Sequence, residues 1–162
     1  MADIFLDVGH RCRRRKELNM SKNTVKHFYP RILADGTTDV VVLTYNEDDD
    51  EIWLNEAYQA IGNGCELIEP IFCTATDGTE YAVIVDEEAP YHKGCQANEK
   101  LTKALRELAV KKGDMAGALA SRMIPVLLGA GFFAMVDRRS SEFIGWNSEE
   151  EARAFLSELV PM

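Results

Sequence analysis

The sequence predicts an α+β fold, in which hairpins build a mainly antiparallel sheet and three or four helices pack on it. Segments rich in β-branched residues alternate with segments whose apolar residues recur at helical spacing. The tripeptide Asp-Gly-Thr also occurs twice, at residues 35–37 and 77–79, and an apolar run, an acidic run and a helix start follow each copy. Because strand pairs and helices then form separate layers, we expect the helices against one face of the sheet.

A single domain is expected from the length and composition. The chain has 162 residues, of which 46% are hydrophobic, enough for one ordinary core. We assign residues 23–162 to this domain and residues 1–22 to a basic N-terminal tail. Residues 1–19 hold five basic residues against three acidic ones. This tail is interpreted either as a segment with little structure or as a basic arm for interaction.

The first hairpin is expected at the start of the domain. Residues 26–33 and 39–45 are predicted strands, and Asp35-Gly36 supplies the turn between them. Since Pro30 has no amide hydrogen to donate to a ladder, its strand is expected at the edge of the sheet.

A helix and a second hairpin follow. Residues 54–61 place their apolar side chains on one helical face, and Gly62 is expected to end this helix in the left-handed conformation. Residues 65–72 and 81–85 then predict two strands that are joined through Asp77-Gly78.

The next helix is expected to begin at Asn98, whose side chain can accept hydrogen bonds from the free amides of the first turn. Residues 101–109 carry its apolar stripe, and Gly113 is placed to close it. A further short helix is predicted over residues 114–122.

The last part of the chain predicts two core strands and a helix. Residues 123–128 and 132–136 are apolar and are separated by a glycine bend. Ser148 and Glu151 have the spacing of a capping box, and residues 152–159 continue as an amphipathic helix.

The charge and the apolar runs exclude several classes of protein. A net charge of -9 argues against general binding to nucleic acid and against adsorption to anionic membranes. The longest apolar stretch, residues 123–136, is shorter than the roughly 18 residues of a membrane span, and it contains Pro125. Residues 1–19 place an apolar patch before their basic residues, the reverse of a secretory signal, which predicts a cytoplasmic protein.

The four cysteines predict free thiols. None of them forms a C-x-x-C pair, and disulfides are rare in the cytoplasm. These residues are Cys12, Cys65, Cys73 and Cys95.

Residues 54–68, with the sequence LNEAYQAIGNGCELI, combine a helix, a pair of glycines and a strand start. Residues 83–88 form a second apolar strand with an acidic turn, and Asn98 follows. In these features the chain, from Asp39 to its end, resembles a phage-associated family catalogued as domain of unknown function 3846. The resemblance implies a small accessory protein of phages, prophages or plasmids, and it brings no established catalytic residues.

Two sets of glycines are candidates for binding a ligand through exposed backbone amides. One is the turn Gly62, Asn63 and Gly64. The other is Gly129 and Gly131, in a segment that fits the dinucleotide pattern G-x-G-x-x-A. A glycine bend between two core strands is the better account of the second set, because the residues that follow have β character rather than helical character.

Two other groups could carry chemistry. His92 and Cys95, with Cys65 and Cys73 as further ligands, are candidates for a structural metal, although zinc needs four converging ligands. Residues 86–88 with His92 could supply a general acid and base, but a polar loop suggests neither burial nor a shifted pKa. A solvated loop with one buried thiol is the better account of the first group, and a solubilising turn is the better account of the second.

The acidic residues form the last candidate site. Five adjacent carboxylates lack the spaced ligands of an EF-hand, so they are interpreted as a solvated loop or as a surface for a basic partner. The predicted acidic interaction surface consists of Glu47, Asp48, Asp49, Asp50, Glu51, Asp86, Glu87 and Glu88.

Two hypotheses about function follow. The first is a small acidic accessory protein of a phage, prophage or plasmid that acts as a non-enzymatic interaction module and binds a host or phage protein. The alternative is a small-molecule or nucleotide-binding protein that could also be hydrolytic. We expect no cofactor, no direct binding to nucleic acid and no association with a membrane.

Overall fold

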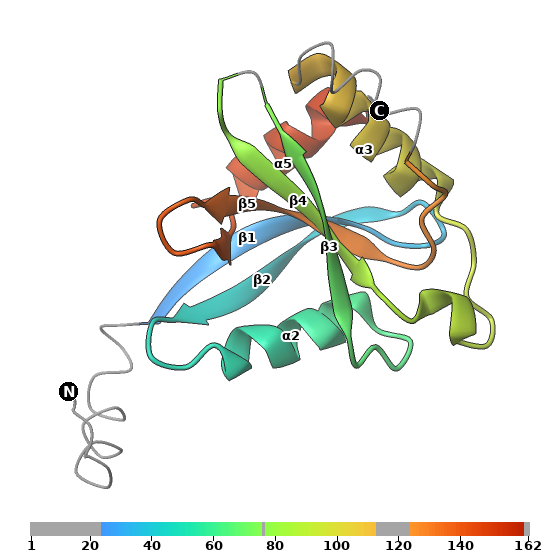
Figure 1. The fold of residues 1–162 in the computed structure, drawn as a ribbon, viewed down its shortest axis with the longest axis horizontal. Helices are drawn as coiled ribbons and strands as arrows, with labels where there is room; N and C mark the ends of the chain where they lie inside the picture. Colours follow the sequence, from blue (N-terminus) through green and yellow to red (C-terminus); the bar gives the residue numbers. More distant parts are fainter. Residues whose placement is uncertain (1–23, 76, 113–123, 161–162) are drawn as a thin grey trace, which may run out of the picture.

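The computed structural model describes residues 24–75, 77–112 and 124–160. The expected tail, the short helix at 114–122 and the closing residue Gly113 lie outside these ranges. Within them the chain forms an antiparallel sheet of six strands with helices packed on it, which confirms the α+β fold (Figure 1). The described elements are β1 (Thr24–Ile32), β2 (Thr38–Asn46), α2 (Glu51–Ile61), β3 (Ile68–Thr74), β4 (Glu80–Asp86), the 3-10 helix η1 (Ala89–Tyr91), α3 (Glu99–Lys112), β5 (Gly131–Asp137), β6 (Glu142–Ile144) and α5 (Glu149–Leu159).

The strands follow the spatial order β2-β1-β5-β4-β3, and β6 pairs with β5 beside β1. Both predicted hairpins are present as β1–β2 and β3–β4. The last apolar strand, β5, lies between them and pairs with β1 and β4. Strand β5, which comes late in the sequence, therefore joins the two hairpins into one sheet.

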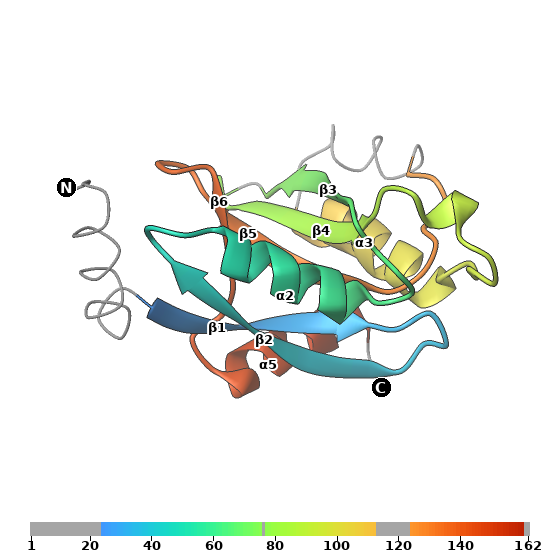
Figure 2. The ribbon, with the colours of Figure 1, turned by 90° about the horizontal axis from the view of Figure 1, so that it is seen from below.

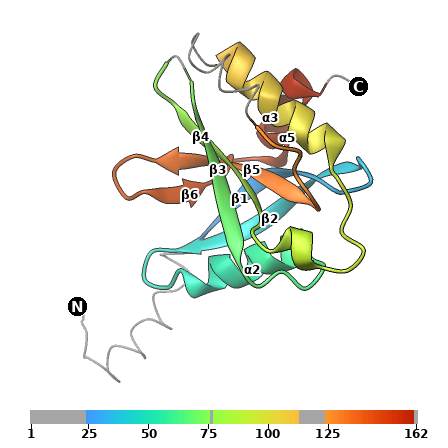
Figure 3. The same ribbon diagram turned by 45° about the vertical axis from the view of Figure 1, so that its right-hand side comes forward.

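Helices cover both faces of the sheet, so the expected arrangement on one face is wrong. Helix α2 packs on one face, while α3 and α5 pack on the other (Figures 2 and 3). The reason lies in β4 and β5, whose side chains are apolar in succession rather than in alternation. Phe132 packs in the cluster under α2, and its neighbour Phe133 packs in the cluster under α3 and α5.

Strand β1 is internal rather than at an edge, which corrects the expectation drawn from Pro30. Phe28 exchanges two backbone hydrogen bonds with Trp146, at 2.9 and 2.8 Å, on the side of β1 that faces β5. Pairing with β5 itself begins only at Arg31. Since alternate residues direct their amides to the same side, the missing amide of Pro30 falls in the gap between these two contacts.

The two Asp-Gly-Thr turns have the same geometry. In the first, Asp35 Oδ1 accepts a hydrogen bond from the amide of Thr37 at 2.9 Å, and in the second Asp77 Oδ1 accepts one from Thr79 at 2.9 Å. Both glycines adopt a φ of 91°, which residues with a side chain rarely take. The repeated tripeptide therefore marks the two hairpin turns.

The helix boundaries match most of the predicted signals. Ser148 Oγ accepts the amide of Glu151 at 3.1 Å, as expected for the cap of α5. Gly62 ends α2 at a φ of 73°, but its ψ of -162° lies outside the left-handed helical region. The left-handed residue is Asn63, with a φ of 52°.

Residues 124–128 do not form the predicted strand, and Met123 lies outside the described residues. Leu128 makes one isolated bridge with Ala97, and the carbonyl of Leu127 accepts the amide of Asn98 at 2.7 Å. The apolar side chain of Leu127 is buried against the α3 face of the sheet. The segment is apolar because it packs in the core as a loop, not because it belongs to a ladder.

The side chain of Asn98 joins three parts of the fold. Its Oδ1 accepts the amide of Leu101 at 3.0 Å and so caps α3. Its Nδ2 donates to the carbonyl of Ile32 at 3.1 Å, at the end of β1, and to that of Gly129 at 2.8 Å, just before β5. Asn98 is fully buried, so no water can replace these bonds.

Replacing Asn98 with Ala is therefore expected to lower the free energy of unfolding by about 2–4 kcal/mol, because buried partners are left without hydrogen bonds. Urea denaturation followed by circular dichroism measures the change. Asn55→Ala, at an exposed position of α2, is the matched control and should shift the stability by less than about 0.5 kcal/mol. Equal stability of the two variants would contradict the role assigned to Asn98.

Candidate functional site

The acidic run at residues 47–51 lies between the end of β2 and the start of α2 (Figure 1). Its side chains are exposed except for that of Asp49, which is half-buried. Asn46 Oδ1 accepts the amide of Asp48 at 2.9 Å, and Asp49 Oδ1 accepts the amide of Glu51 at 3.0 Å. The run is thus an ordered turn that presents its remaining carboxylates to solvent.

The second acidic group lies at the opposite end of the sheet, because β2 and β4 run in opposite directions. Glu87 and Glu88 are exposed there, whereas Asp86 is buried. Asp86 Oδ1 accepts the amide of Glu88 at 2.8 Å and helps to shape the turn. The eight predicted acidic residues therefore do not form one surface.

Other carboxylates join the first acidic run instead. The turn between β5 and β6 lies at the same end of the sheet as the β2–α2 loop (Figure 3). Hydrogen bonding to Glu142, burial, and the nearby charges of Glu142, Glu47 and Asp137 raise the pKa of Tyr45 to about 12. We call the residues 47–51, Asp137 and Glu142 the acidic end.

A cavity of about 250 Å³ opens at the acidic end. Its walls are largely apolar, and the acidic residues Asp50 and Glu142 are among those that line it. Trp53 and Phe143 stack with ring centroids 5.8 Å apart, and Phe143 stacks in turn on Phe72 at 6.2 Å. Phe72 is 54% exposed, so the aromatic row continues to the surface. The cavity is lined by Tyr45, Asp50, Trp53, Leu54, Ile68, Ser141, Glu142 and Phe143.

Sequence reasoning missed Tyr45, Asp137, Glu142 and Phe143 as members of this site. The β5–β6 hairpin was not predicted, because β6 spans only Glu142–Ile144. The polar run at residues 137–141, between two apolar segments, is the signal that indicates such a turn. Its Asp137 Oδ1 accepts the amide of Arg139 at 2.9 Å.

The candidate metal residues do not assemble a metal centre. Among the described residues, no group of three or more His, Cys, Asp or Glu side chains is arranged to hold an ion. His92 Nε2 lies 2.9 Å from Asp86 Oδ2, although its N–H is not aligned with that oxygen. Burial is the main cause that raises the pKa of Cys65 to about 11, and burial also raises the pKa of Cys95. Both thiols are therefore weak nucleophiles at neutral pH.

The described cysteines are free thiols, as predicted for Cys65, Cys73 and Cys95. Cys12 lies outside the described residues. The buried position of Asp86 differs from the solvated loop that the sequence suggested for residues 86–88.

The glycines of the dinucleotide pattern serve the packing of the core. Gly131 is the first residue of β5, whereas a dinucleotide site requires the segment to open a helix. A Cβ at Gly131 would lie 2.6 Å from Leu101 Cδ2 and 3.0 Å from Val85 Cγ1. Gly131 thus lets α3 lie close to the sheet, as expected for the glycine bend.

The glycine turn at residues 62–64 and the arginines of the β5–β6 turn lie at opposite ends of the sheet. Residues 62–64 follow α2 at the end where β3 begins, whereas Arg138 and Arg139 follow β5 at the acidic end. These arginines do not converge on either glycine set.

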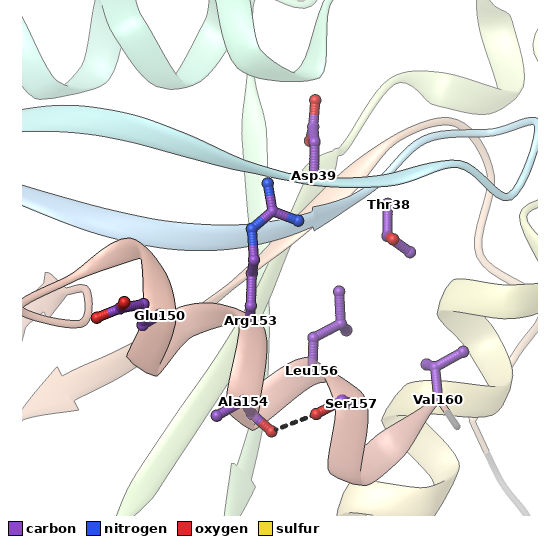
Figure 4. A pocket seen from close by; sticks show the side chains of 8 residues that line it. All are labelled: Thr38, Asp39, Glu150, Arg153, Ala154, Leu156, Ser157 and Val160. Atoms are coloured by element: carbon purple, nitrogen blue, oxygen red, sulfur yellow. Dashed lines mark hydrogen bonds between the residues drawn. The ribbon is translucent and has the colours of Figure 1, made fainter. Parts of the chain in front are cut away.

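A second cavity, of about 400 Å³, lies between the start of β2 and α5 (Figure 4). Arg153 and Leu156 extend from α5 toward the β2 residues Thr38 and Asp39. The Asp39 carboxylate points away from α5 and binds Arg31 through two hydrogen bonds of 2.8 and 2.5 Å. The walls are mainly apolar, and the cavity borders an outer strand of the sheet.

Comparison of the chain with known protein families, curated proteins and solved structures finds no match. Within the part of the chain that the structure describes, none of the helices has the length and apolar character of a membrane span.

Replacing Gly131 with Ala is expected to lower the stability by about 1–3 kcal/mol, since the added methyl group overpacks the contact between α3 and the sheet. Thermal and urea unfolding measure the effect. Gly64→Ala is the control, because a Cβ there meets nothing within 4 Å and adds only the strain of a positive φ. A Gly131→Ala chain as stable as the wild-type chain would contradict the packing role assigned to Gly131.

Replacing Glu142 with Gln is expected to bring the pKa of Tyr45 back toward its ordinary value of 10.0, since the carboxylate that accepts its hydrogen is removed. The pKa of Tyr45 is higher in the folded chain than in the unfolded chain. The protonated hydroxyl of Tyr45 therefore contributes fully to the free energy of unfolding below pH 10.0, and this contribution is lost as the pH rises through about 12. Residue-resolved NMR titration follows Tyr45. Glu88→Gln, at the other end of the sheet, should leave this pKa unchanged.

Proposed function

We propose that this protein is a small acidic accessory protein of a phage, prophage or plasmid, which acts in the bacterial host cytoplasm as a non-enzymatic interaction module. Its partner is a host or phage protein with a basic surface. One observation supports this most: the loop after β2 and the β5–β6 hairpin bring residues 47–51, Asp137 and Glu142 to one end of the sheet, beside a largely apolar cavity that Tyr45 helps to line.

The charge of the acidic end favours a basic partner. Like charges held close together create a negative potential that attracts lysine and arginine and speeds association. The net charge of -9 for the whole chain adds to this attraction. The pKa of Tyr45 is raised mainly by its hydrogen bond to Glu142 and by burial, and the charges of Glu142, Glu47 and Asp137 add to this effect.

The cavity gives the acidic end a place to hold a side chain. A lysine or arginine can rest its apolar stem against Trp53 and Phe143 while its charged head lies near Asp50 and Glu142. Aromatic side chains of this kind often contribute most of the energy at protein interfaces. A basic residue of the partner is therefore the proposed contact.

The assignment to a mobile element depends on the family resemblance of residues 54–68 and 83–88. The genes that flank the coding sequence test this part of the proposal, since genes for phage structure or plasmid replication are expected there. Host genes of central metabolism on both sides would contradict it.

The alternative, a small-molecule or nucleotide-binding protein, has less support. The cavities at the acidic end and beside α5 contain none of the five candidate residues Gly62, Asn63, Gly64, Gly129 and Gly131. Neither of these two cavities is lined by a cysteine or a histidine, so neither holds a thiol or an imidazole as nucleophile or base.

The double change Asp48→Lys and Asp50→Lys is expected to abolish retention of the partner from host lysate, because it reverses the charge of the acidic end. Asp49 is left in place, since it holds the amide of Glu51. The matched control is Glu87→Lys with Glu88→Lys, which makes the same charge change at the opposite end of the sheet.

Affinity capture at moderate salt, with the retained protein identified by mass spectrometry, compares the three chains. The wild-type chain and the control should retain the same protein, and added salt should weaken the binding. Loss of retention with both double variants would mean that net charge alone matters and would contradict the assignment to the acidic end.

A further inference from the structure

The two outermost strands of the sheet differ in how well they are protected. Strand β3 carries Pro70 near its centre, which discourages a further strand from pairing with it. Strand β2 has the opposite character, with Val40, Val41 and Val42 in succession and neither proline nor lysine within it. An edge of this kind is a template for pairing with another extended chain.

The register shows which backbone groups of β2 face outward. Phe28 bonds with Trp146 on the side away from β2, so Val42, its partner in the register, directs its N–H and C=O away from β1. By the same alternation Val40 and Thr44 also face outward. Glu56 of α2 accepts the amide of Thr44, at 2.5 Å. No described residue bonds the amides of Val40 and Val42, so the edge is open at these two positions.

The cavity beside α5 lies next to this open edge. Because Ile32 and Thr38 are partners in the register and Ile32 packs under α3 and α5, the side chains of Thr38, Val40 and Val42 point to that face. Val42 is 44% exposed there. A chain added along β2 would place every second side chain on the same face, over the cavity of about 400 Å³ lined by α5.

The charged residues around the groove between β2 and α5 indicate which kind of chain can bind there. The first turn of α5 carries Glu149, Glu150 and Glu151, and Arg153 is paired with Glu149 at 2.8 Å. Glu150 lies at the end of the cavity opposite Val160 (Figure 4). The groove therefore favours a basic residue at the Glu150 end. A second copy of this chain, which also has a charge of -9, is opposed by like-charge repulsion.

We propose that the groove between the edge of β2 and α5 binds an extended segment of a partner protein as an added strand. The segment pairs its backbone with Val40 and Val42 and inserts alternate apolar side chains beside Leu156 and Val160. A lysine or arginine of the segment lies near Glu150. Strand addition into a groove between an edge strand and a helix combines backbone affinity with side-chain selectivity. The proposal concerns a different surface from the acidic end and goes beyond the proposed function.

Selection from a library of random short peptides tests the groove with the full chain as bait. The wild-type chain should enrich peptides that alternate apolar and polar residues and carry a basic residue at one end. Val42→Pro removes an outward amide but no bond to β1, and it should weaken binding of an enriched peptide by roughly tenfold or more, the effect of losing one buried hydrogen bond and crowding the strand. Val42→Thr keeps the amide and the strand, so it should bind as the wild type does.

Hydrogen exchange of the wild-type chain provides a reading that does not depend on any variant. In the free chain the amides of Val40 and Val42 should exchange faster than those of Val41 and Leu43, which face β1. Addition of an enriched peptide should protect Val40 and Val42, whereas the amide of Thr44 should change little.

Several results would overturn the proposal. These are the absence of enriched peptides, equal binding to the Val42→Pro chain, or protection that appears away from β2. A wild-type dimer that Val42→Pro converts to a monomer would assign the edge to a second copy instead. The variant with Asp48→Lys and Asp50→Lys should still bind the enriched peptide, so failure of the acidic end and failure of the groove can be told apart.

Discussion

The buried amide of Asn98 is the interaction on which the arrangement of the sheet and its α3 face depends. One side chain caps α3, holds the end of β1 and fixes the bend before β5. Because β5 fills the middle of the sheet, its starting position decides how the two hairpins are joined. An amide is suited to this task, since it accepts and donates at the same time, which neither a carboxylate nor an ammonium group can do. The neighbouring Gly131 completes the arrangement, because only a residue without a side chain lets Leu101 reach the sheet.

The central strands also determine where binding surfaces can lie. With β4 and β5 buried on both faces, α2 occupies one side and α3 with α5 the other, and little of either face is left open. The sheet itself is then accessible to partners mainly at its ends and along its outer strands. The acidic end uses the loops after β2 and β5, whereas the groove beside α5 uses the unpaired side of β2. Strand β2 contributes to both, because it is the outermost strand and its last residues enter the acidic turn.

Local signals in the sequence predicted most of the elements. The Asp-Gly-Thr turns, the cap at Ser148 and the apolar face of α2 all depend on residues close together in the chain, and the structure confirms them. The errors concern partners that are distant in sequence. Pro30 suggested an edge strand, but β1 is internal, because it pairs with Trp146 before Pro30 and with β5 after Pro30. The apolar run at 124–128 suggested a strand, but Asn98 and α3 hold it as a loop.

By itself, the sequence determined the α+β class, the two hairpin turns, the helix that Asn98 caps and the negative charge of the chain. Periodicity, turn chemistry and net charge carry this information because each depends on neighbouring residues or on composition alone. Only the tertiary structure decided that Asp86 is buried at the end of the sheet opposite residues 47–51, that Tyr45, Asp137 and Glu142 join residues 47–51, and that β2 has an open edge beside α5. These features arise from strand order and direction, which depend on contacts between residues far apart in the chain and therefore leave no local mark in the sequence.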